Sequence, residues 1–366
     1  MFYRLLRIPE VYGAGRYFSW SIRPGLLIIV YLMSTWPSLC LTISPWQTAI
    51  LDAPTVLTKS DWNLSVAPGF KQTNLTKRPP SFPYISGDTF RALADHVFDE
   101  TVHELDFAQI DASLIRTGDS VFVKTDYLKR FFTQLHPRIT ATYILITHNS
   151  DRANPGDYAH YLDDPKLGHW FGCNPDLPQP QPKFTGIPIG LANAYHGMHG
   201  EHGVMTAARR ALQQKPKLHK RYLLGLNFAV LTNHTERGRV HALFNQKPYC
   251  KVFMDAKNRG RQSYKNYLKD LTRTQFVISP HGAGLDCHRT WEALLLGSVP
   301  VVQSSTLDGL YTDLPVIVVP KWSQVTRKLL RAQLAAHSTQ NFKLERLFFP
   351  YWADLISTKQ AEIRRS

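Results

Sequence analysis

The second half of the chain alternates short apolar runs with segments in which apolar residues recur at helical spacing. The runs at 221–230, 274–279, 299–303 and 316–319 are expected to be strands, and the segments at 237–243, 264–271, 287–296 and 323–334 are expected to be helices. Strands that alternate with helices form a parallel sheet with helices packed on its faces. The pattern therefore predicts a Rossmann-like α/β domain over residues 216–366.

The first half shows the same alternation in a weaker form. Strands are predicted at 119–124, 141–147 and 183–189, and helices at 89–99 and 127–135. We expect a second Rossmann-like domain over residues 85–215. Ligands of such sheets bind at the carboxyl ends of the strands, so two facing domains would hold a ligand between them.

An uncharged stretch near the N-terminus, residues 25–43, is just long enough to cross a bilayer as a helix. Four arginines and a single glutamate precede it, so the positive-inside rule places residues 1–24 in the cytosol. Pro37 would kink this helix. We expect a transmembrane signal anchor. A cleaved signal peptide, or a buried helix in a chain with a misassigned start, is the alternative.

Residues 44–84 are rich in Pro, Thr, Ser, Asn and Lys and lack a sustained apolar period, which is typical of a stem. Glycosylation sequons begin at Asn63 and Asn74, and a third begins at Asn233. An anchor, a stem and a large C-terminal part are the layout of a single-pass type II enzyme of the Golgi or ER membrane, if the host is eukaryotic. In another host the same layout predicts a membrane-associated protein.

The chain has 366 residues and a formal net charge of +15. Its basic residues form only modest clusters, without zinc-finger spacing, an aromatic RNA-binding signature or a long basic run. Nucleic acid is therefore not expected as a partner, whereas a basic surface would attract an anionic small substrate. The cysteines, Cys40, Cys173, Cys250 and Cys287, show no CxxC or metal-ligand spacing.

The most informative segment is 276–303, where a buried strand precedes a loop with two glycines and then a helix. Glycines let the backbone approach a ligand closely, and a helix start with its free N–H groups favours a phosphate. Asp286 is the expected N-cap of this helix. His281, in this loop, could have a structural role instead of a binding role. The candidate binding residues in and beside the loop are Pro280, His281, Gly282, Gly284 and Asp286.

Asp286, Arg289 and Glu292 are spaced by three and can contribute to one surface of the helix. A guanidinium suits a diphosphate, and a carboxylate suits the two hydroxyls of a ribose. The alternative is that Arg289 and Glu292 simply pair with each other on the helix, which would contribute about 0.2–0.5 kcal/mol.

This segment resembles the donor-binding signature of exostosin-like glycosyltransferases, and especially of the group similar to ribitol xylosyltransferase. The stretches 147–151, 170–171 and 187–191 are similar to the same group, so the resemblance spans roughly residues 85–352. It implies a GT-B fold, a nucleotide-diphosphate sugar as donor and no required metal.

The resemblance also implies roles for single residues. Glu292 would hold the ribose, Gly282 and Gly284 would line the diphosphate, and Arg289 would support the phosphate or the helix face. Arg237, at the start of a predicted helix, is similar to the basic residue that neutralises the leaving diphosphate.

Glycosyl transfer also needs a base for the acceptor hydroxyl. The candidates are Asp151 and His148, after a predicted strand, and Asp88; the two carboxylates could instead be turn or cap residues. We interpret the pair Asp163 and Asp164 as a turn rather than a metal site.

We therefore expect an inverting, metal-independent hexosyl- or pentosyltransferase that acts on a glycan or glycoprotein hydroxyl. The alternatives are a non-catalytic carbohydrate- or nucleotide-binding protein on the same fold, and a nucleic-acid-binding protein.

Overall fold

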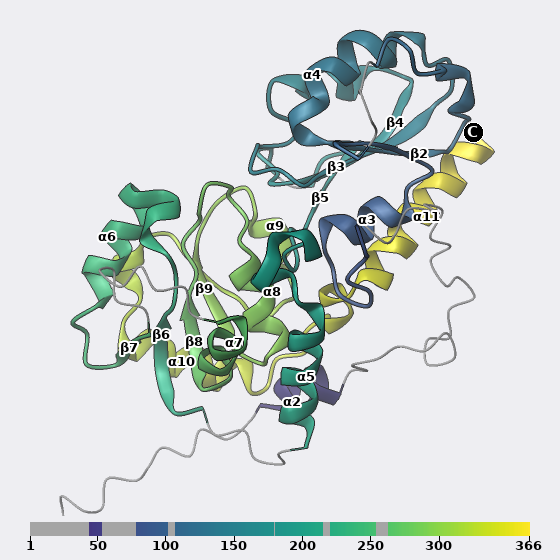
Figure 1. The fold of residues 1–366 in the computed structure, drawn as a ribbon. Coiled ribbons are helices and arrows are strands. Elements are labelled where there is room, and N and C mark those ends of the chain that lie inside the picture. Colours follow the sequence, from purple (N-terminus) through teal and green to yellow (C-terminus); the bar gives the residue numbers. More distant parts are fainter. Residues whose placement is uncertain (1–43, 53–77, 102–106, 179, 215–219, 254–262) are drawn as a thin grey trace, which may run out of the picture. The chain divides into compact units, whose positions relative to one another are not determined.

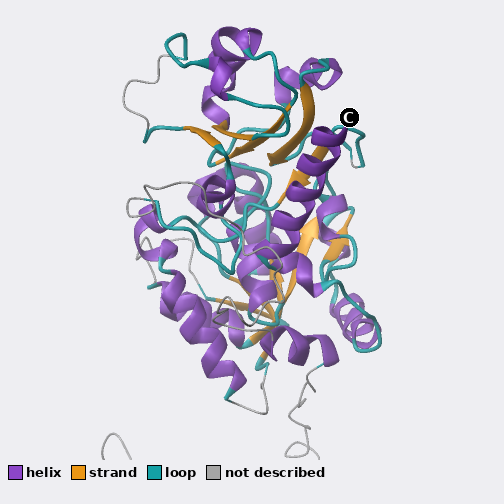
Figure 2. Ribbon diagram, turned by 90° about the vertical axis from the view of Figure 1, so that its right-hand side faces the viewer, coloured by secondary structure: helices purple, strands orange, loops and turns teal. Residues whose placement is uncertain are grey.

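The structure is a computed structural model that describes residues 44–52, 78–101, 107–178, 180–214, 220–253 and 263–366. These residues contain two five-stranded sheets (Figure 1), and every strand pairing in both sheets is parallel. Helices lie beside the strands of each sheet, as Figure 2 shows. The predicted α/β class with two parallel sheets is therefore confirmed.

The strands of the first sheet follow one another in space in the order of the sequence, from β1 to β5. They are β1 (His96–Phe98), β2 (Ser120–Lys124), β3 (Tyr143–His148), β4 (Leu167–Cys173) and β5 (Phe184–Ile187). The helical segments of this half are α3 (Gly87–Leu93), α4 (Leu128–Arg130) with the π turn η3 (Phe131–Leu135), and the 3-10 segments η1 (Ala112–Leu114), η2 (Thr125–Tyr127), η4 (His136–Arg138), η5 (Gly156–Asp163) and η6 (Ala194–Gly200).

The helix predicted at 89–99 is too long, because α3 ends at Leu93 and the chain then enters β1. Asp95 lies between the two elements, and its carboxylate accepts hydrogen bonds from the backbone N–H and the hydroxyl of Ser120 in β2 (2.9 and 2.8 Å). These bonds fix the segment as an edge strand of the sheet.

The second sheet has the strand order β10-β9-β8-β6-β7. Its strands are β6 (Tyr222–Leu226), β7 (Cys250–Val252), β8 (Thr274–Ile278), β9 (Val299–Gln303) and β10 (Ile317–Val319). Its helical segments are α5 (His202–Gln213), η7 (Val230–Asn233), α6 (His234–Phe244), α7 (Tyr264–Thr272), α8 (His288–Leu295), α9 (Asp308–Tyr311), η8 (Trp322–Gln324), α10 (Arg327–His337), η9 (Leu344–Leu347) and α11 (Phe349–Arg365).

Alternate side chains of the first sheet enter different cores. Val121, Val123 and Leu145 pack with Leu128 of α4 and with the aromatic side chains of η3 on one face. Phe122 and Ile144 point to the opposite face, into a core that continues to the second sheet. The first sheet is thus buried on both sides, as parallel sheets usually are.

The last helix, α11, returns from the second sheet to pack against α3 and β3 (Figure 1). Phe349 packs edge-on against Phe90 of α3, with ring centroids 5.2 Å apart, and Gln360 donates a hydrogen bond to the carbonyl oxygen of Gly118 (2.9 Å). The C-terminal helix therefore belongs to the core of the first sheet.

Both ends of the predicted stem are folded. Residues Pro45–Asp52 form helix α2, in which Trp46 and Ile50 are buried. Gln47 of α2 donates to the carbonyl oxygen of Gly297 (2.7 Å). The prediction of a structureless stem is thus wrong for 45–52, because its few apolar residues are spaced for one buried helix face.

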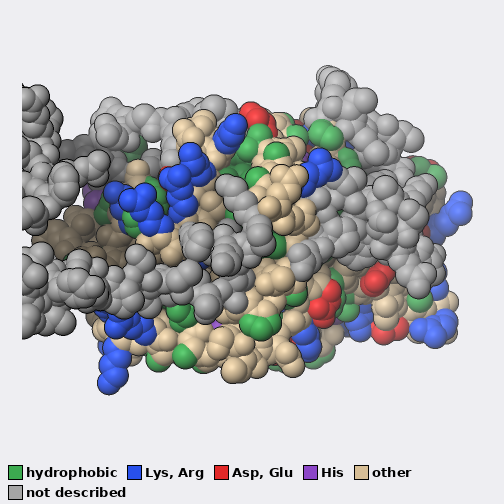
Figure 3. All heavy atoms as spheres, turned by 90° about the horizontal axis from the view of Figure 1, so that it is seen from below, with side chains coloured by type: hydrophobic (Ala, Val, Ile, Leu, Met, Phe, Trp, Pro, Cys, Tyr) green, Lys and Arg blue, Asp and Glu red, His purple; other side chains and the backbone are tan. Residues whose placement is uncertain are grey.

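The tail at 1–24, the anchor at 25–43 and the sequons at Asn63 and Asn74 lie outside the described residues, and the anchor stays a prediction. None of the helices in the described ranges is long and apolar enough to span a bilayer. Figure 3 shows Lys and Arg side chains at several separate places on one face, with a few acidic side chains between them.

Candidate functional site

The order in which the strands are added to the second sheet reverses between β6 and β8. These two strands are neighbours, but β7 separates them in sequence and lies outside β6. Ligands of open α/β sheets bind at such a switch point, beyond the carboxyl ends of the strands. The loops that leave β6 and β8 there contain Phe228 and the predicted residues Pro280–Gly284.

Arg237 lies on α6, and its guanidinium turns toward the loop after β8. Its Nε donates to the carbonyl oxygen of His281 (3.0 Å), and Nη1 donates to the carbonyl oxygen of Ala229 (3.0 Å) and to the Thr232 hydroxyl. Burial, together with the positive charge of Arg289, lowers the pKa of Arg237 to about 10. The group is thus still cationic at neutral pH.

Arg289, on α8, reaches the same place. Its Nε donates to the carbonyl oxygen of Asn227 (2.9 Å), whereas its buried Nη1 has no hydrogen-bond partner among the described residues. Both guanidinium groups lie over the ring of Phe228, with centroid distances of 5.4 Å for Arg289 and 5.8 Å for Arg237.

No ion pair joins either arginine to a carboxylate in the part of the chain that the structure describes, so the predicted alternative of an Arg289–Glu292 pair is not seen there. Two buried cations that share one aromatic ring repel each other, and their charge is costly without a counterion. The arrangement is therefore electrostatically suited to an anion.

The two loop glycines are needed for close approach rather than for a left-handed backbone, since neither is among the residues with positive φ. A Cβ on Gly282 would lie 2.8 Å from Arg237 Nη2. A Cβ on Gly284 would lie 3.1 Å from Asp151 Oδ1 and from Asn174 Nδ2. The loop thus lies between the arginines of the second sheet and the loop that follows β3.

Glu292 is buried and accepts a hydrogen bond from the hydroxyl of Tyr267 on α7 (2.7 Å). Burial and the nearby charge of Glu292 raise the pKa of Tyr267 well above its usual value. Glu292 follows Arg289 by one helical turn, so the carboxylate predicted to bind a ribose lies beside the arginines but already has a protein partner.

Asp286 was expected to be the N-cap of the helix, and this is wrong: α8 begins at His288, with Cys287 as N-cap. Asp286 instead accepts hydrogen bonds from the backbone N–H of Ile189 (2.8 Å) and from the indole of Trp291 (2.9 Å). Its own N–H donates to Asn174 Oδ1 (2.8 Å). Burial raises the pKa of Asp286 to about 6. The residue therefore links the two sheets.

The three candidate bases have different surroundings. Asp88 is fully buried and accepts bonds from Arg78 Nε to both oxygens (3.0 and 2.9 Å). His148 is buried between the carbonyl oxygen of Pro188 (3.1 Å) and the backbone N–H of Asn149 (2.7 Å), and burial lowers its pKa to about 4. Asp151 is exposed, and no described residue forms an ion pair with it.

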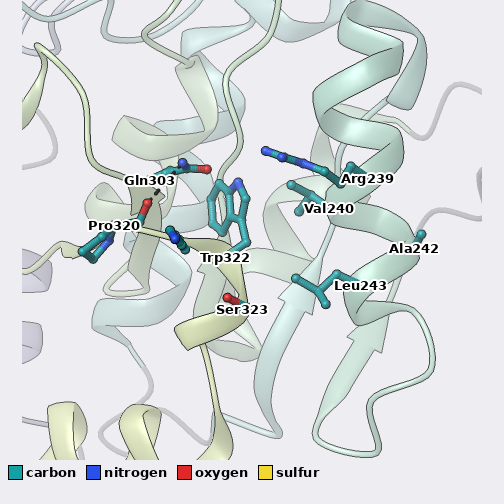
Figure 4. A pocket seen from close by; sticks show the side chains of 9 residues that line it. Arg239, Val240, Ala242, Leu243, Gln303, Pro320, Trp322 and Ser323 are labelled. Carbon is teal, nitrogen blue, oxygen red and sulfur yellow. Dashed lines mark hydrogen bonds between the residues drawn. The ribbon is translucent and has the colours of Figure 1, made fainter.

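Two adjoining cavities open beside the loop after β8. The smaller has a volume of about 300 Å³ and is lined by His281 and Cys287; Cys287 Sγ lies 3.5 Å from Arg237 Nη2. The larger has a volume of about 710 Å³ and lies between α6 and the segment after β10 (Figure 4). The predicted binding residue His281 is thus at a cavity wall.

Sequence reasoning missed Phe228, Asn174 and Asn233. Phe228 lies near the carboxyl end of the strand predicted at 221–230, which is the signal that could have found it. Asn233, predicted as a sequon, caps α6 by accepting from Glu236 N–H (3.1 Å) and donates to the carbonyl oxygen of Gly282 (3.0 Å). A glycan on this amide would disturb the loop.

Within the described ranges, no group of three or more metal-ligating side chains gathers in one place. The Asp164 carboxylate accepts from the N–H of Lys166 (2.8 Å) and contacts His136 Nε2 (3.0 Å), as in the predicted turn. Cys173, Cys250 and Cys287 are free thiols.

A family model described as the RXYLT1 C-terminal domain, of the ribitol xylosyltransferase group, matches residues 209–352, which are less than half of the chain. This confirms the resemblance over a span that includes all the predicted donor-binding residues.

No curated protein sequence matches the chain. A crystal structure of an alpha1,3-fucosyltransferase is similar at 12% sequence identity with a TM-score of 0.33, over 70% of this chain and 93% of that chain. A likeness at this score is too weak to define a shared fold.

Proposed function

We propose that the protein is a glycosyltransferase that moves a hexose or pentose from a nucleotide-diphosphate sugar to a hydroxyl group of a glycan or glycoprotein. The observation that carries this proposal is the pair of buried guanidinium groups of Arg237 and Arg289 at the switch point of the second sheet. The family match over residues 209–352 supports it.

In this reaction the bond between the sugar and the diphosphate breaks, and the leaving diphosphate gains negative charge. Arg289 Nη1 is buried and unpartnered among the described residues, so it can donate to a phosphate oxygen without giving up a protein bond. Preorganised donors of this kind stabilise charge that develops in a transition state. We propose that the two arginines do this without a metal ion or other cofactor.

Asp151 is the base that we propose for the acceptor hydroxyl. It is the exposed member of the three candidates, and its Oδ1 lies against Gly284 in the donor-side loop. His148 and Asp88 are occupied by protein hydrogen bonds. A single displacement with Asp151 as base would invert the configuration of the sugar.

Turnover of a panel of nucleotide sugars by the full chain tests the proposal. Arg289→Gln should remain folded and lose about 10²–10³-fold in turnover, the usual effect of removing one preorganised donor. Arg331→Gln, an exposed arginine on α10, is the matched control and should behave as wild type. Folded wild type that turns over no nucleotide sugar contradicts the proposal.

Metal independence has its own test, because it does not follow from the transfer itself. Turnover should persist in excess chelator. A complete loss that added metal reverses would contradict the metal-free role of the two arginines.

A further inference from the structure

We propose that the nucleobase of the donor binds in the larger cavity, against Trp322 and between α6 and the segment after β10. The cavity of about 710 Å³ is lined by Arg239, Val240, Ala242, Leu243, Gln303, Pro320, Lys321, Trp322 and Ser323 (Figure 4). This inference rests on the proposed function and specifies where the donor's base lies.

The larger cavity lies next to the smaller one, which leads toward the two arginines. Arg239, Gln303 and Trp322 line both cavities, so the two adjoin each other. The smaller cavity reaches Cys287, whose sulfur lies 3.5 Å from Arg237 Nη2. A nucleotide with its diphosphate at the arginines can therefore extend through the smaller cavity and place its base in the larger one.

The wall of the larger cavity has the chemistry that a nucleobase needs. Leu243 and Pro320 supply apolar surface, and the small accessible part of Trp322, which is 5% exposed, adds to it. The indole is held in place because its Nε1 donates to Glu236 Oε1 (2.6 Å). Small-molecule sites are lined mainly by apolar side chains with a few polar groups, and this wall has that character.

A small number of polar groups lies at the edge of this apolar wall. The Gln303 amide donates through Nε2 to the carbonyl oxygen of Pro320 (3.2 Å), which leaves its Oε1 to accept from a base N–H. The Arg239 guanidinium is paired with Glu236 Oε2 (2.6 Å). A sugar would bring a hydroxyl on nearly every carbon to this wall and leave many of them unpaired, so a base fits better.

Calorimetric titration of the full chain with pyrophosphate, UDP, CDP, GDP and ADP tests the inference. At least one nucleoside diphosphate should bind tenfold or more tightly than pyrophosphate. Ser323→Phe adds a ring from an exposed, cavity-lining position and should reduce that affinity to the pyrophosphate level, while pyrophosphate binding is unchanged. Gln324→Phe, at the next exposed position, does not line the cavity and is the matched control.

Gln303→Leu provides a second, milder variant that keeps the side-chain volume and removes the amide. It should weaken the preferred nucleoside diphosphate about tenfold and leave pyrophosphate binding unchanged, as the loss of one bond to a base edge implies. Full nucleoside diphosphate affinity in both variants would overturn the inference and leave the proposed function standing. Failure of folded wild type to bind pyrophosphate or any nucleoside diphosphate would instead count against the proposed function itself.

Discussion

Asp88 and Asp151 both lie near the carboxyl end of β3, yet their surroundings give them different chemistry. Asp88 lies in the first turn of α3 and is closed in by Arg78, whose Nη2 is 2.7 Å from Oδ1. Asn149 Nδ2 approaches the same oxygen at 3.3 Å. Asp151 faces solvent and the Gly284 backbone. The first residue therefore stabilises the fold, and the second is available to take a proton.

Replacement of Asp151 by Asn should separate catalysis from binding. Turnover should fall by about 10²–10⁴-fold, the usual contribution of a general base, because the amide cannot accept the acceptor's proton. The melting temperature and the affinity for nucleoside diphosphate should not change. Single-turnover kinetics and calorimetry measure the two effects. Unchanged turnover would remove Asp151 from the mechanism and leave the arginine site intact.

Replacement of Asp88 by Asn should instead unfold the protein more easily. Breaking a buried ion pair leaves the Arg78 guanidinium underpaired and costs about 3–5 kcal/mol; its second partner, the half-exposed Glu100, favours the lower end. Urea denaturation measures this loss. Asp126→Asn breaks an exposed pair with Arg152 and should cost at most about 1 kcal/mol. Equal losses in the two variants would contradict the structural role of Asp88.

At the scale of elements, the segment from β8 to β9 could be predicted because each local signal agrees with the fold. Three apolar residues, Phe276–Ile278, end the strand before Pro280, glycines mark the loop, and Gly297 follows α8 with positive φ. The strand β4 could not be predicted, because Gly168 and His169 interrupt its apolar pattern and are covered by neighbouring strands and by α11, far away in the sequence.

The candidate site likewise contains residues that the sequence could predict and residues that it could not. The resemblance assigned Arg237 and Arg289 to the same diphosphate, and the structure brings both guanidinium groups over Phe228. Asp286 was misplaced, because its partners Ile189 and Asn174 come from the other half of the chain and no local pattern reports them. Long-range hydrogen bonds decide such residues, and a single sequence does not contain their signal.

The loop after β8 should be sensitive to one added methyl group. In Gly282→Ala the new Cβ would lie 2.8 Å from Arg237 Nη2 and displace the guanidinium. Affinity for nucleoside diphosphate should fall about tenfold or more, since a hydrogen bond to a charged group contributes about 1.5–3 kcal/mol. Calorimetry measures it. Gly203→Ala, in α5 with open space around the new Cβ, should bind normally. Normal binding by Gly282→Ala would contradict the position of Arg237.

The strand β4 should make the first sheet sensitive to acid. Burial, with the positive charge of Lys359 on α11, lowers the pKa of His169 to about 4, against 6.5 when unfolded. The folded state then binds fewer protons between these values, so stability is complete above pH 6.5 and is lost as the pH falls to about 4. Wild type should lose about 3 kcal/mol more than His169→Gln between pH 7 and pH 4.

Urea unfolding at several pH values measures this difference. The exposed His160→Gln is the control and should follow wild type. Parallel stability curves for wild type and His169→Gln would mean that His169 is not buried as a neutral imidazole.

At the scale of the whole molecule, the described residues from Ser44 to the C-terminus belong to one compact unit. Three kinds of contact join its two sheets. Asp286 bonds to Ile189 and Asn174 at the carboxyl ends of the strands. The core that contains Phe122 and Ile144 continues to Leu224 of the second sheet. The helix α11 runs from the second sheet to the first. A ligand site built from both sheets is therefore held by contacts outside the site as well.

The return of α11 predicts that a change at the C-terminus destabilises strands more than two hundred residues earlier. Ile356 is fully buried in α11, and Ile356→Ala should cost about 2–5 kcal/mol through the lost side-chain burial and the cavity it leaves. Hydrogen exchange should then accelerate in β3, against which α11 packs. Thr358→Ala, exposed on the same helix, is the control and should leave exchange unchanged. Faster exchange confined to β8 and β9, with β3 still protected, would show that α11 belongs energetically to the second sheet instead.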